Sequence, residues 1–202
     1  MGFTIKQINK DRLLRLKESS IWGEECPVHY SRLRIAEVQF VDFDNQVTQG
    51  ELIVLEQVAE SVVKIFQELL ELKFPIEKML PMEEFCGDDV LSMKANNSSA
   101  YNGRKVARTD RWSSHAYGCA IDINPIQNPY LLLNEHKELV EVIPFEGENY
   151  LDRSNQRKGM IEEVVPVFVK HRFSDWGGSW EAKPDYHHFQ LPWSKIDSLF
   201  SK

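Results

Sequence analysis

One segment of this sequence, SSHAYGCAIDINP at 113–125, combines a histidine, His115, with an aspartate, Asp122. Small residues and Gly118 separate the two, so a turn can bring the imidazole back towards the carboxylate. We expect a short strand over 119–123, in which side chains alternate between faces and Asp122 lies on the open face. A carboxylate on an otherwise apolar strand must be exposed, paired or bound to metal. Because zinc accepts imidazole nitrogen and carboxylate oxygen, the segment predicts two ligands of a metal site.

A second segment, DYHHFQ at 185–190, offers the remaining groups of such a site: Asp185, His187 and His188. A catalytic zinc uses three protein ligands and keeps one position open for water. It also requires a nearby carboxylate that takes the proton of that water and passes it to the leaving amine. Asp185 is the predicted base. Ligand chemistry alone does not choose between His187 and His188 as the third ligand.

The two segments together resemble the zinc D-alanyl-D-alanine carboxypeptidase family. That family also contains D-Ala-D-Ala dipeptidases and L-alanyl-D-glutamate endopeptidases. The pattern Ser-x-His-x-x-Gly-x-Ala-x-Asp runs from Ser113 to Asp122, and the pattern Asp-x-x-His-Phe begins at Asp185. The resemblance implies that one zinc ion (Zn2+) per chain is held by His115, Asp122 and His188. It also implies that Asp185 is the catalytic acidic residue, and it leaves His187 as a neighbour of the site.

Two further stretches resemble the endopeptidase branch of this family. They are WGGSW at 176–180 and INPIQNPY at 123–130. One position departs from the family pattern, because Gln190 stands where many relatives place a glutamate after His-Phe. That position is not a ligand, so we expect only an altered hydrogen bond around the site.

The resemblance implies a hydrolase of bacterial peptidoglycan (cell-wall murein) stem peptides. The scissile bond is at the D-Ala terminus or between L-Ala and D-Glu. Arg104 is a candidate for holding a substrate carboxylate or the developing oxyanion, since a guanidinium forms two parallel hydrogen bonds. Ser113 and Trp180 are further candidates for substrate binding. The alternative is a non-catalytic zinc-binding recognition module, as in the Hedgehog relatives, but a purely structural site needs no base such as Asp185.

Histidines and cysteines outside these motifs are interpreted as structural or surface residues. His29, His136 and His171 lie in charged or polar surroundings. The three cysteines, Cys26, Cys86 and Cys119, form no Cys-x-x-Cys pair, so a cysteine zinc site is unsupported. Cys119 lacks an adjacent base and is interpreted as a packing residue, while a pairing of Cys26 with Cys86 is left open.

The periodicity of the chain predicts a mixture of strands and helices. A β-hairpin is expected from 33–43 and 51–55, followed by a helix over 56–74 that Pro75 ends. Further along, we expect polar loops over 87–114, a short helix over 161–169 and a strand over 188–193. Without a βαβ alternation this pattern indicates an α+β fold. The resemblance adds a small mixed domain, with an antiparallel sheet and flanking helices, like the Hedgehog domain and the D,D-peptidases.

The composition limits the class of protein. The chain has 202 residues, of which 42% are apolar and 11% aromatic, enough for a sizeable core. Its formal net charge of -7 offers no basic field for a phosphate backbone, so we expect no nucleic-acid partner. We expect one peptidase domain over 1–202, with a helical and hairpin portion over about 1–80 and a zinc-site portion over about 81–202. A monomer is expected.

No apolar run approaches the roughly 18 residues of a membrane span, so no transmembrane segment is predicted. The N-terminal stretch is polar and lacks the apolar region of a secretory signal. The expected substrate lies in the cell wall, which favours the cell envelope, the periplasm or secretion. We therefore expect either a leader removed from the chain or another route to the substrate.

Overall fold

The structure is a computed structural model that describes residues 2–201, and its N-terminal part is built on an antiparallel sheet. In the order β1-β2-β3, its strands are β1 (Thr4–Gln7), β2 (Leu33–Val41) and β3 (Val47–Leu55). β2 and β3 form the predicted hairpin, although β3 starts at Val47, earlier than predicted. The turn is stabilised by the Asp42 carboxylate, which accepts the backbone N–H groups of Asp44 (2.9 Å) and Gln46 (2.8 Å).

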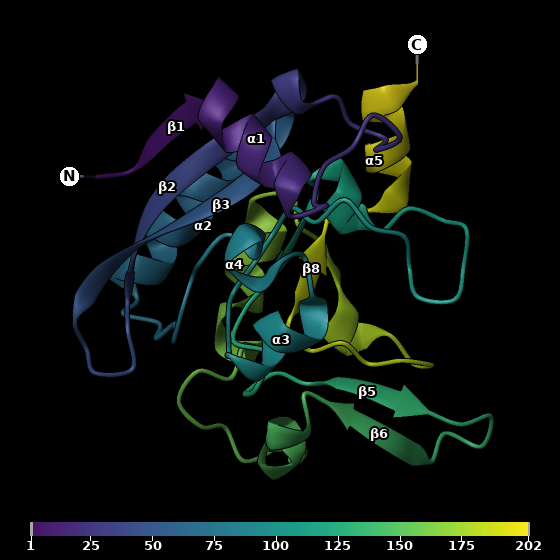
Figure 1. Ribbon diagram of the computed structural model, residues 1–202. Coiled ribbons are helices and arrows are strands. Elements are labelled where there is room, and N and C mark those ends of the chain that lie inside the picture. Colours follow the sequence, from purple (N-terminus) through teal and green to yellow (C-terminus); the bar gives the residue numbers. More distant parts are fainter. Residues whose placement is uncertain (1, 202) are drawn as a thin grey trace.

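Two helices pack against this sheet. They are α1 (Lys10–Glu18) and α2 (Ala59–Glu71). Figure 1 shows α2 behind the sheet and α1 in front of its upper end. The residues that α2 buries follow helical spacing and include Val62, Ile65, Phe66 and Leu69. The predicted helix is therefore confirmed, with ends shorter than predicted.

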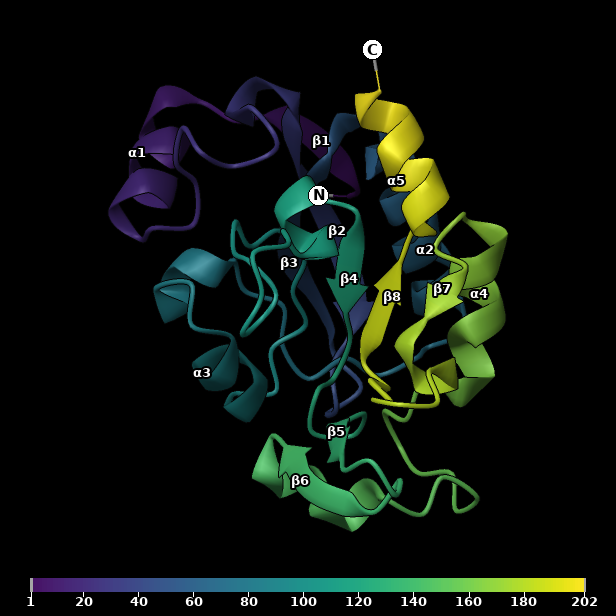
Figure 2. The ribbon, with the colours of Figure 1, turned by 90° about the vertical axis from the view of Figure 1, so that its right-hand side faces the viewer.

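A second antiparallel sheet lies in the C-terminal part of the chain. Its strands, in the order β4-β8-β7, are β4 (Ala120–Asp122), β8 (His188–Gln190) and β7 (Asp175–Trp176). Figure 2 shows β4 and β8 side by side, with α4 beside β7 and α2 behind them. Phe189 of β8 is fully buried and stacks on Phe168 of α4, with ring centroids 3.9 Å apart. Phe189 therefore faces the core, and its two neighbours in the strand, His188 and Gln190, face the opposite side.

The remaining elements include several for which there was no prediction. They are α3 (Asp89–Lys94), β5 (Tyr130–Leu133), β6 (Leu139–Ile143), α4 (Val165–Lys170) and α5 (Trp193–Phe200). The helix predicted over 161–169 begins as a 3-10 turn and becomes α4 only at Val165. The stretch predicted as loops contains α3, and the strand predicted over 188–193 ends at Gln190, where the chain soon turns into α5. The mixed α+β class is confirmed, with several small antiparallel sheets in place of one.

The hydrophobic core is shared by the two portions of the chain. It joins Leu55 and Phe66 from the N-terminal part to Ile121 and Phe189 from the second sheet. Gly118 lies where the two parts meet, with φ of 65° and its carbonyl accepting the N–H of Leu55 at 2.9 Å. A Cβ at Gly118 would lie 2.5 Å from the Leu55 nitrogen, so only glycine fits this approach. The assignment of 1–202 to one peptidase domain stays a prediction.

None of the helices described between residues 2 and 201 is both long enough and apolar enough to cross a bilayer.

Candidate metal centre

His115 is held by a 3-10 turn, Ser114–Tyr117, that precedes β4. The hydroxyl of Ser113 accepts the backbone N–H of His115 at 3.3 Å and caps this turn. The ring is buried, with 4% of the residue exposed, and its Nδ1 donates to the backbone carbonyl of Ala100. Because the neutral ring carries its one N–H at Nδ1 for this bond, its lone pair is on Nε2.

Asp122 and His188 face each other across the second sheet, as directly paired residues of β4 and β8. His188 Nδ1 lies 2.9 Å from Asp122 Oδ1, and His115 Nε2 lies 3.2 Å from Asp122 Oδ2. The two imidazole nitrogens are 3.2 Å apart. One ligand atom from each of these three residues lies within 4.8 Å of the other two. The structure therefore brings together the three ligands implied by the family resemblance.

The donor set fits a zinc ion. His188 Nε2 lies 3.0 Å from the side-chain oxygen of Gln190, which leaves Nδ1 towards Asp122. Two ring nitrogens and one carboxylate thus converge, each ring held from behind by an oxygen acceptor, which is the usual support of a metal-ligating histidine. Burial by itself would raise the pKa of Asp122, but the imidazoles of His115 and His187 hold it well below its usual value. The Asp122 carboxylate is therefore ionised at neutral pH, as a carboxylate ligand of a metal must be.

His187 lies beside this cluster but does not belong to it. Its Nδ1 is 2.8 Å from the backbone oxygen of Asn128, and its Nε2 is 3.0 Å from Asp185 Oδ1. Its nearest atom to Asp122 is 4.0 Å from that carboxylate. Burial opposes a charge on His187, but the carboxylates of Asp185 and Asp122 outweigh it and raise its pKa to about 9. Its two nitrogens therefore serve Asn128 and Asp185, and the geometry selects His188 for the cluster.

Asp185 sits in the turn that leads into β8, held from two sides. Its N–H donates to the carbonyl of Gly177 at 2.9 Å, and its own carbonyl accepts the N–H of His188 at 3.2 Å. A Cβ on Gly177 would lie 2.4 Å from the Asp185 carbonyl oxygen, so this glycine of the WGGSW stretch allows the close approach. On the other side, Leu131 of β5 donates its N–H to Pro184 at 2.8 Å. The turn thus places the Asp185 carboxylate against His187 at the edge of the cluster.

The three predicted substrate-binding residues occupy different environments. Ser113 is buried and caps the turn that carries His115. Trp180 is half-buried, with its ring centroid 5.3 Å from that of His188. Arg104 is partly exposed, and its guanidinium forms an ion pair with Asp89 at the start of α3. Substrate binding by these residues stays a prediction, and Ser113 has a clear second role as a helix cap.

Sequence reasoning did not single out two polar residues that support the site, Asn128 and Asp175. It did name Gln190 as a position of altered hydrogen bonding. Asn128 is fully buried, and its side-chain nitrogen donates to the carbonyls of Ile123 and Gly159 at 3.1 and 3.0 Å. Asp175 accepts from Gln190 at 2.8 Å. The available signal was their position: Asn128 lies in the INPIQNPY stretch and Asp175 directly precedes WGGSW.

The cysteines take no part in the cluster. Cys26, Cys86 and Cys119 are all free thiols, so the pairing left open for Cys26 and Cys86 is absent. Cys119 is buried behind β4, and burial raises the pKa of its thiol to about 12. A thiol of that kind is not ionised at neutral pH and serves as a packing group.

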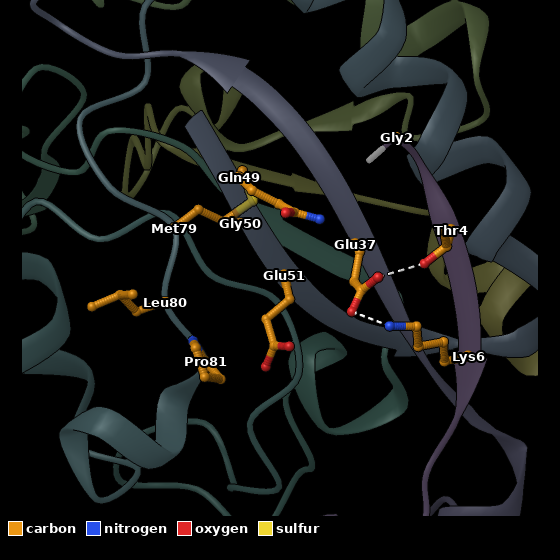
Figure 3. A pocket seen from close by; sticks show the side chains of 10 residues that line it. All are labelled: Gly2, Thr4, Lys6, Glu37, Gln49, Gly50, Glu51, Met79, Leu80 and Pro81. Atoms are coloured by element: carbon orange, nitrogen blue, oxygen red, sulfur yellow. Dashed lines mark hydrogen bonds and ion pairs between the residues drawn. The ribbon is translucent and has the colours of Figure 1, made fainter. Parts of the chain in front are cut away.

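A groove of about 620 Å³ lies on the N-terminal sheet, and its lining residues are not those of the metal centre. Figure 3 shows Glu37 between two partners, accepting from Thr4 at 2.6 Å and forming an ion pair with Lys6. Glu51, also in its wall, pairs with the buried Arg12. The candidate ligand atoms converge at the metal centre, so we place the chemistry there and not in this groove.

The histidine, aspartate and histidine side chains of this α+β chain converge beside a further carboxylate and offer the donor set of a metal site. Residues 107–191 match the family model described as D-alanyl-D-alanine carboxypeptidase. The match confirms the resemblance drawn from the sequence and supports a peptidase. It spans the three clustered residues and Asp185, whereas Arg104 lies outside it. Comparisons with curated proteins and with solved structures gave no match.

Proposed function

We propose that this protein is a zinc-dependent peptidase that hydrolyses bonds to D-amino acids in peptidoglycan stem peptides. The observation that carries the proposal is the convergence of His115 Nε2, His188 Nδ1 and the Asp122 carboxylate, with all three atoms within 4.8 Å of one another. The family match over residues 107–191 supports the peptide substrate. Neither ring nitrogen is committed to a fixed acceptor elsewhere, so a cation is the chemical group that this arrangement favours.

A zinc ion held by His115, Asp122 and His188 would supply a Lewis acid that polarises the scissile carbonyl and lowers the pKa of a water molecule. In this proposal Asp185 accepts the proton of that water and later donates it to the leaving amine. His187 supports the assignment, because its contact with Asp185 Oδ1 at 3.0 Å orients the carboxylate. In this proposal the second oxygen of Asp185 faces the reacting groups.

Substrate binding is proposed for the rim of the cluster. Trp180 presents an aromatic surface next to His188, with ring centroids 5.3 Å apart. Arg104 lies in the segment that leads to Ser113, whose N–H donates to the Arg104 carbonyl at 3.1 Å. Its guanidinium is shared with Asp89 and partly exposed, so it is accessible to a substrate carboxylate or oxyanion. We favour the L-Ala–D-Glu endopeptidase branch over the carboxypeptidase branch, on the resemblance of WGGSW and INPIQNPY.

The alternative is a zinc-binding recognition module without catalysis. Asp185 argues against it, because a recognition site has no use for a carboxylate held at the edge of the cluster by His187. A hydrolase with a cysteine nucleophile is also disfavoured by the buried thiol of Cys119, whose pKa is about 12.

Digestion of purified murein, followed by mass spectrometry of the fragments, tests the proposal. We expect cleavage that a chelator stops and added zinc restores. Loss of D-Ala alone identifies the carboxypeptidase reaction, and a cut between L-Ala and D-Glu identifies the endopeptidase. Zinc binding without any cleavage supports the recognition module, and cleavage that is insensitive to chelator overturns the metal mechanism.

A further inference from the structure

A chain of hydrogen bonds leads from the metal centre to the aromatic side chain beside it. His188 Nε2 lies 3.0 Å from Gln190 Oε1, and Gln190 Nε2 donates to Asp175 Oδ2 at 2.8 Å. The other oxygen of Asp175 accepts the indole N–H of Trp180 at 2.8 Å. Gln190 is only 3% exposed, and its backbone pairs with that of Asp175 across β8 and β7. Four side chains are thus connected in one line.

The chemistry of these groups permits one direction of donation along the chain. An ionised carboxylate only accepts, and an indole N–H only donates, so Asp175 receives a proton from each side. The amide of Gln190 must then turn its nitrogen to Asp175 and its oxygen to His188. An amide oxygen also only accepts, so the proton of the neutral His188 ring is on Nε2. The lone pair is on Nδ1, which is the nitrogen that points to Asp122 at 2.9 Å.

We propose that Asp175 is a positioning residue of the metal centre. Through Gln190 it holds the proton of His188 on Nε2 and thereby selects Nδ1 as the metal-binding nitrogen. The same carboxylate anchors Trp180, so the orientation of the ligand and of the proposed substrate wall depend on one residue of β7. The inference rests on the proposed function, because it requires that the cluster binds zinc.

This series of hydrogen bonds also explains why a glutamine suits position 190. A glutamate there would place a second carboxylate against Asp175, and two acceptors would face each other in a buried site. An asparagine at position 175 would remove that conflict, because its amide nitrogen can donate to the glutamate while its oxygen accepts from Trp180. The two positions are therefore coupled: every hydrogen bond is satisfied when one of them is a carboxylate and the other an amide.

Three variants test this coupling: Gln190→Glu, Asp175→Asn and the double variant with both changes. All three are close to isosteric with the wild type. In Gln190→Glu the carboxylates repel each other, and in Asp175→Asn the amide of Gln190 can reverse and turn a donor towards His188. We expect each single change to weaken zinc affinity about 10–100-fold. The double variant should return to within about threefold of the wild type, because contacting residues are not additive.

The measurements are zinc affinity by competition with a chromogenic chelator and the protonation of the His188 ring by nitrogen NMR. Glu181→Gln is the matched control, since it neutralises an exposed carboxylate next to Trp180 whose ion pair within residues 2–201 is with Lys137 at 3.3 Å. Single variants with wild-type affinity, or a double variant no better than the singles, overturn the inference. If a single variant does not fold, the zinc affinity of the double variant decides. An affinity within about threefold of the wild type supports the inference, and a larger loss overturns it. A wild-type protein that binds no zinc contradicts the proposed function itself.

Discussion

In the N-terminal sheet β2 and β3 are each 9 residues long, whereas β4 and β8 are 3 residues long and β7 only 2. The long strands bury apolar side chains such as Leu52 and Val54. The short strands carry His188 and Gln190 into the interior, where each is hydrogen-bonded. One sheet is therefore stabilised mainly by apolar burial, whereas the other combines the buried Ile121 and Phe189 with polar contacts that have specific geometry.

The comparison has a physical basis. Buried apolar surface contributes roughly 25 cal/mol per Å² without regard to direction, so a long ladder tolerates small shifts. A buried polar group that loses its partner costs about 1–3 kcal/mol, so the short strands accept few arrangements. Asn128, in the loop that follows β4, is buried and bonded through both ends of its side chain, and it shows how residues beside the second sheet satisfy this demand. Substitutions in the two sheets should therefore fail in different ways.

The largest effect is expected from the ligands. His115→Ala and His188→Ala should each reduce zinc from about one ion per chain to near zero, because two remaining protein ligands bind zinc poorly. His187→Ala should keep most of the metal, since its nitrogens contact Asn128 and Asp185. Metal analysis after mild purification measures both. A His187 variant without zinc, beside a His188 variant that retains it, would show that the ligand assignment is wrong.

Asp185→Asn should keep zinc and lose turnover by about 10²–10⁴-fold, the usual contribution of a positioned acid/base group. The amide has nearly the same shape but cannot accept the proton. Turnover of a stem peptide and zinc content are measured on the same sample. Full activity would remove the base assignment, and loss of metal would instead make Asp185 a ligand.

In the N-terminal sheet, Leu52→Ala should destabilise the fold by about 2–5 kcal/mol through a buried cavity. Zinc affinity of the protein that stays folded should not change, because Leu52 contributes no hydrogen bond to the cluster. Chemical denaturation and metal competition separate the two readouts. Val47→Ala, at an exposed position of the same strand, is the control and should change stability by no more than about 0.5 kcal/mol. A zinc defect in the folded Leu52 variant would undermine the division between the two sheets.

The smallest effect is expected at the rim. Arg104→Lys should bind zinc normally and lose roughly tenfold or more in kcat/KM, because an ammonium lacks the two-pronged hydrogen bond. A fall in kcat indicates a contact with the oxyanion, and a rise in KM indicates a ground-state carboxylate. Asp89→Asn is the companion variant, since it removes the partner of Arg104 and leaves the guanidinium. Equal losses in both variants would assign Arg104 a structural role only.

Several features of the fold were predictable because they depend on local sequence. The helix α2 follows from the spacing of Val62, Ile65 and Leu69, and the hairpin follows from its turn at Asp42. The ends of elements were less predictable. The N-terminal β1 and α1 had no prediction, because their side chains are mostly exposed and show weak periodicity.

The sequence by itself determined which chemical groups are available to this protein. The order and spacing of His115, Asp122, Asp185 and His188 are properties of the chain, and they indicate a metal site and a base without any structure. Gly118 and Gly177 were also present in the motifs, although the need for them is a matter of three-dimensional contact. A sequence motif states which side chains are present, so it shows which chemical groups a site can use.

Only the tertiary structure decided how those groups are used. Adjacent histidines in one segment are chemically equal, and the pairing of β4 with β8 is what sets His188 opposite Asp122 and leaves His187 to Asp185. The contact of Gln190 with Asp175 likewise arises from β7, which lies 15 residues away along the chain. Hydrogen bonds and metal coordination depend on distance and direction in space, and strand pairing between distant segments supplies both.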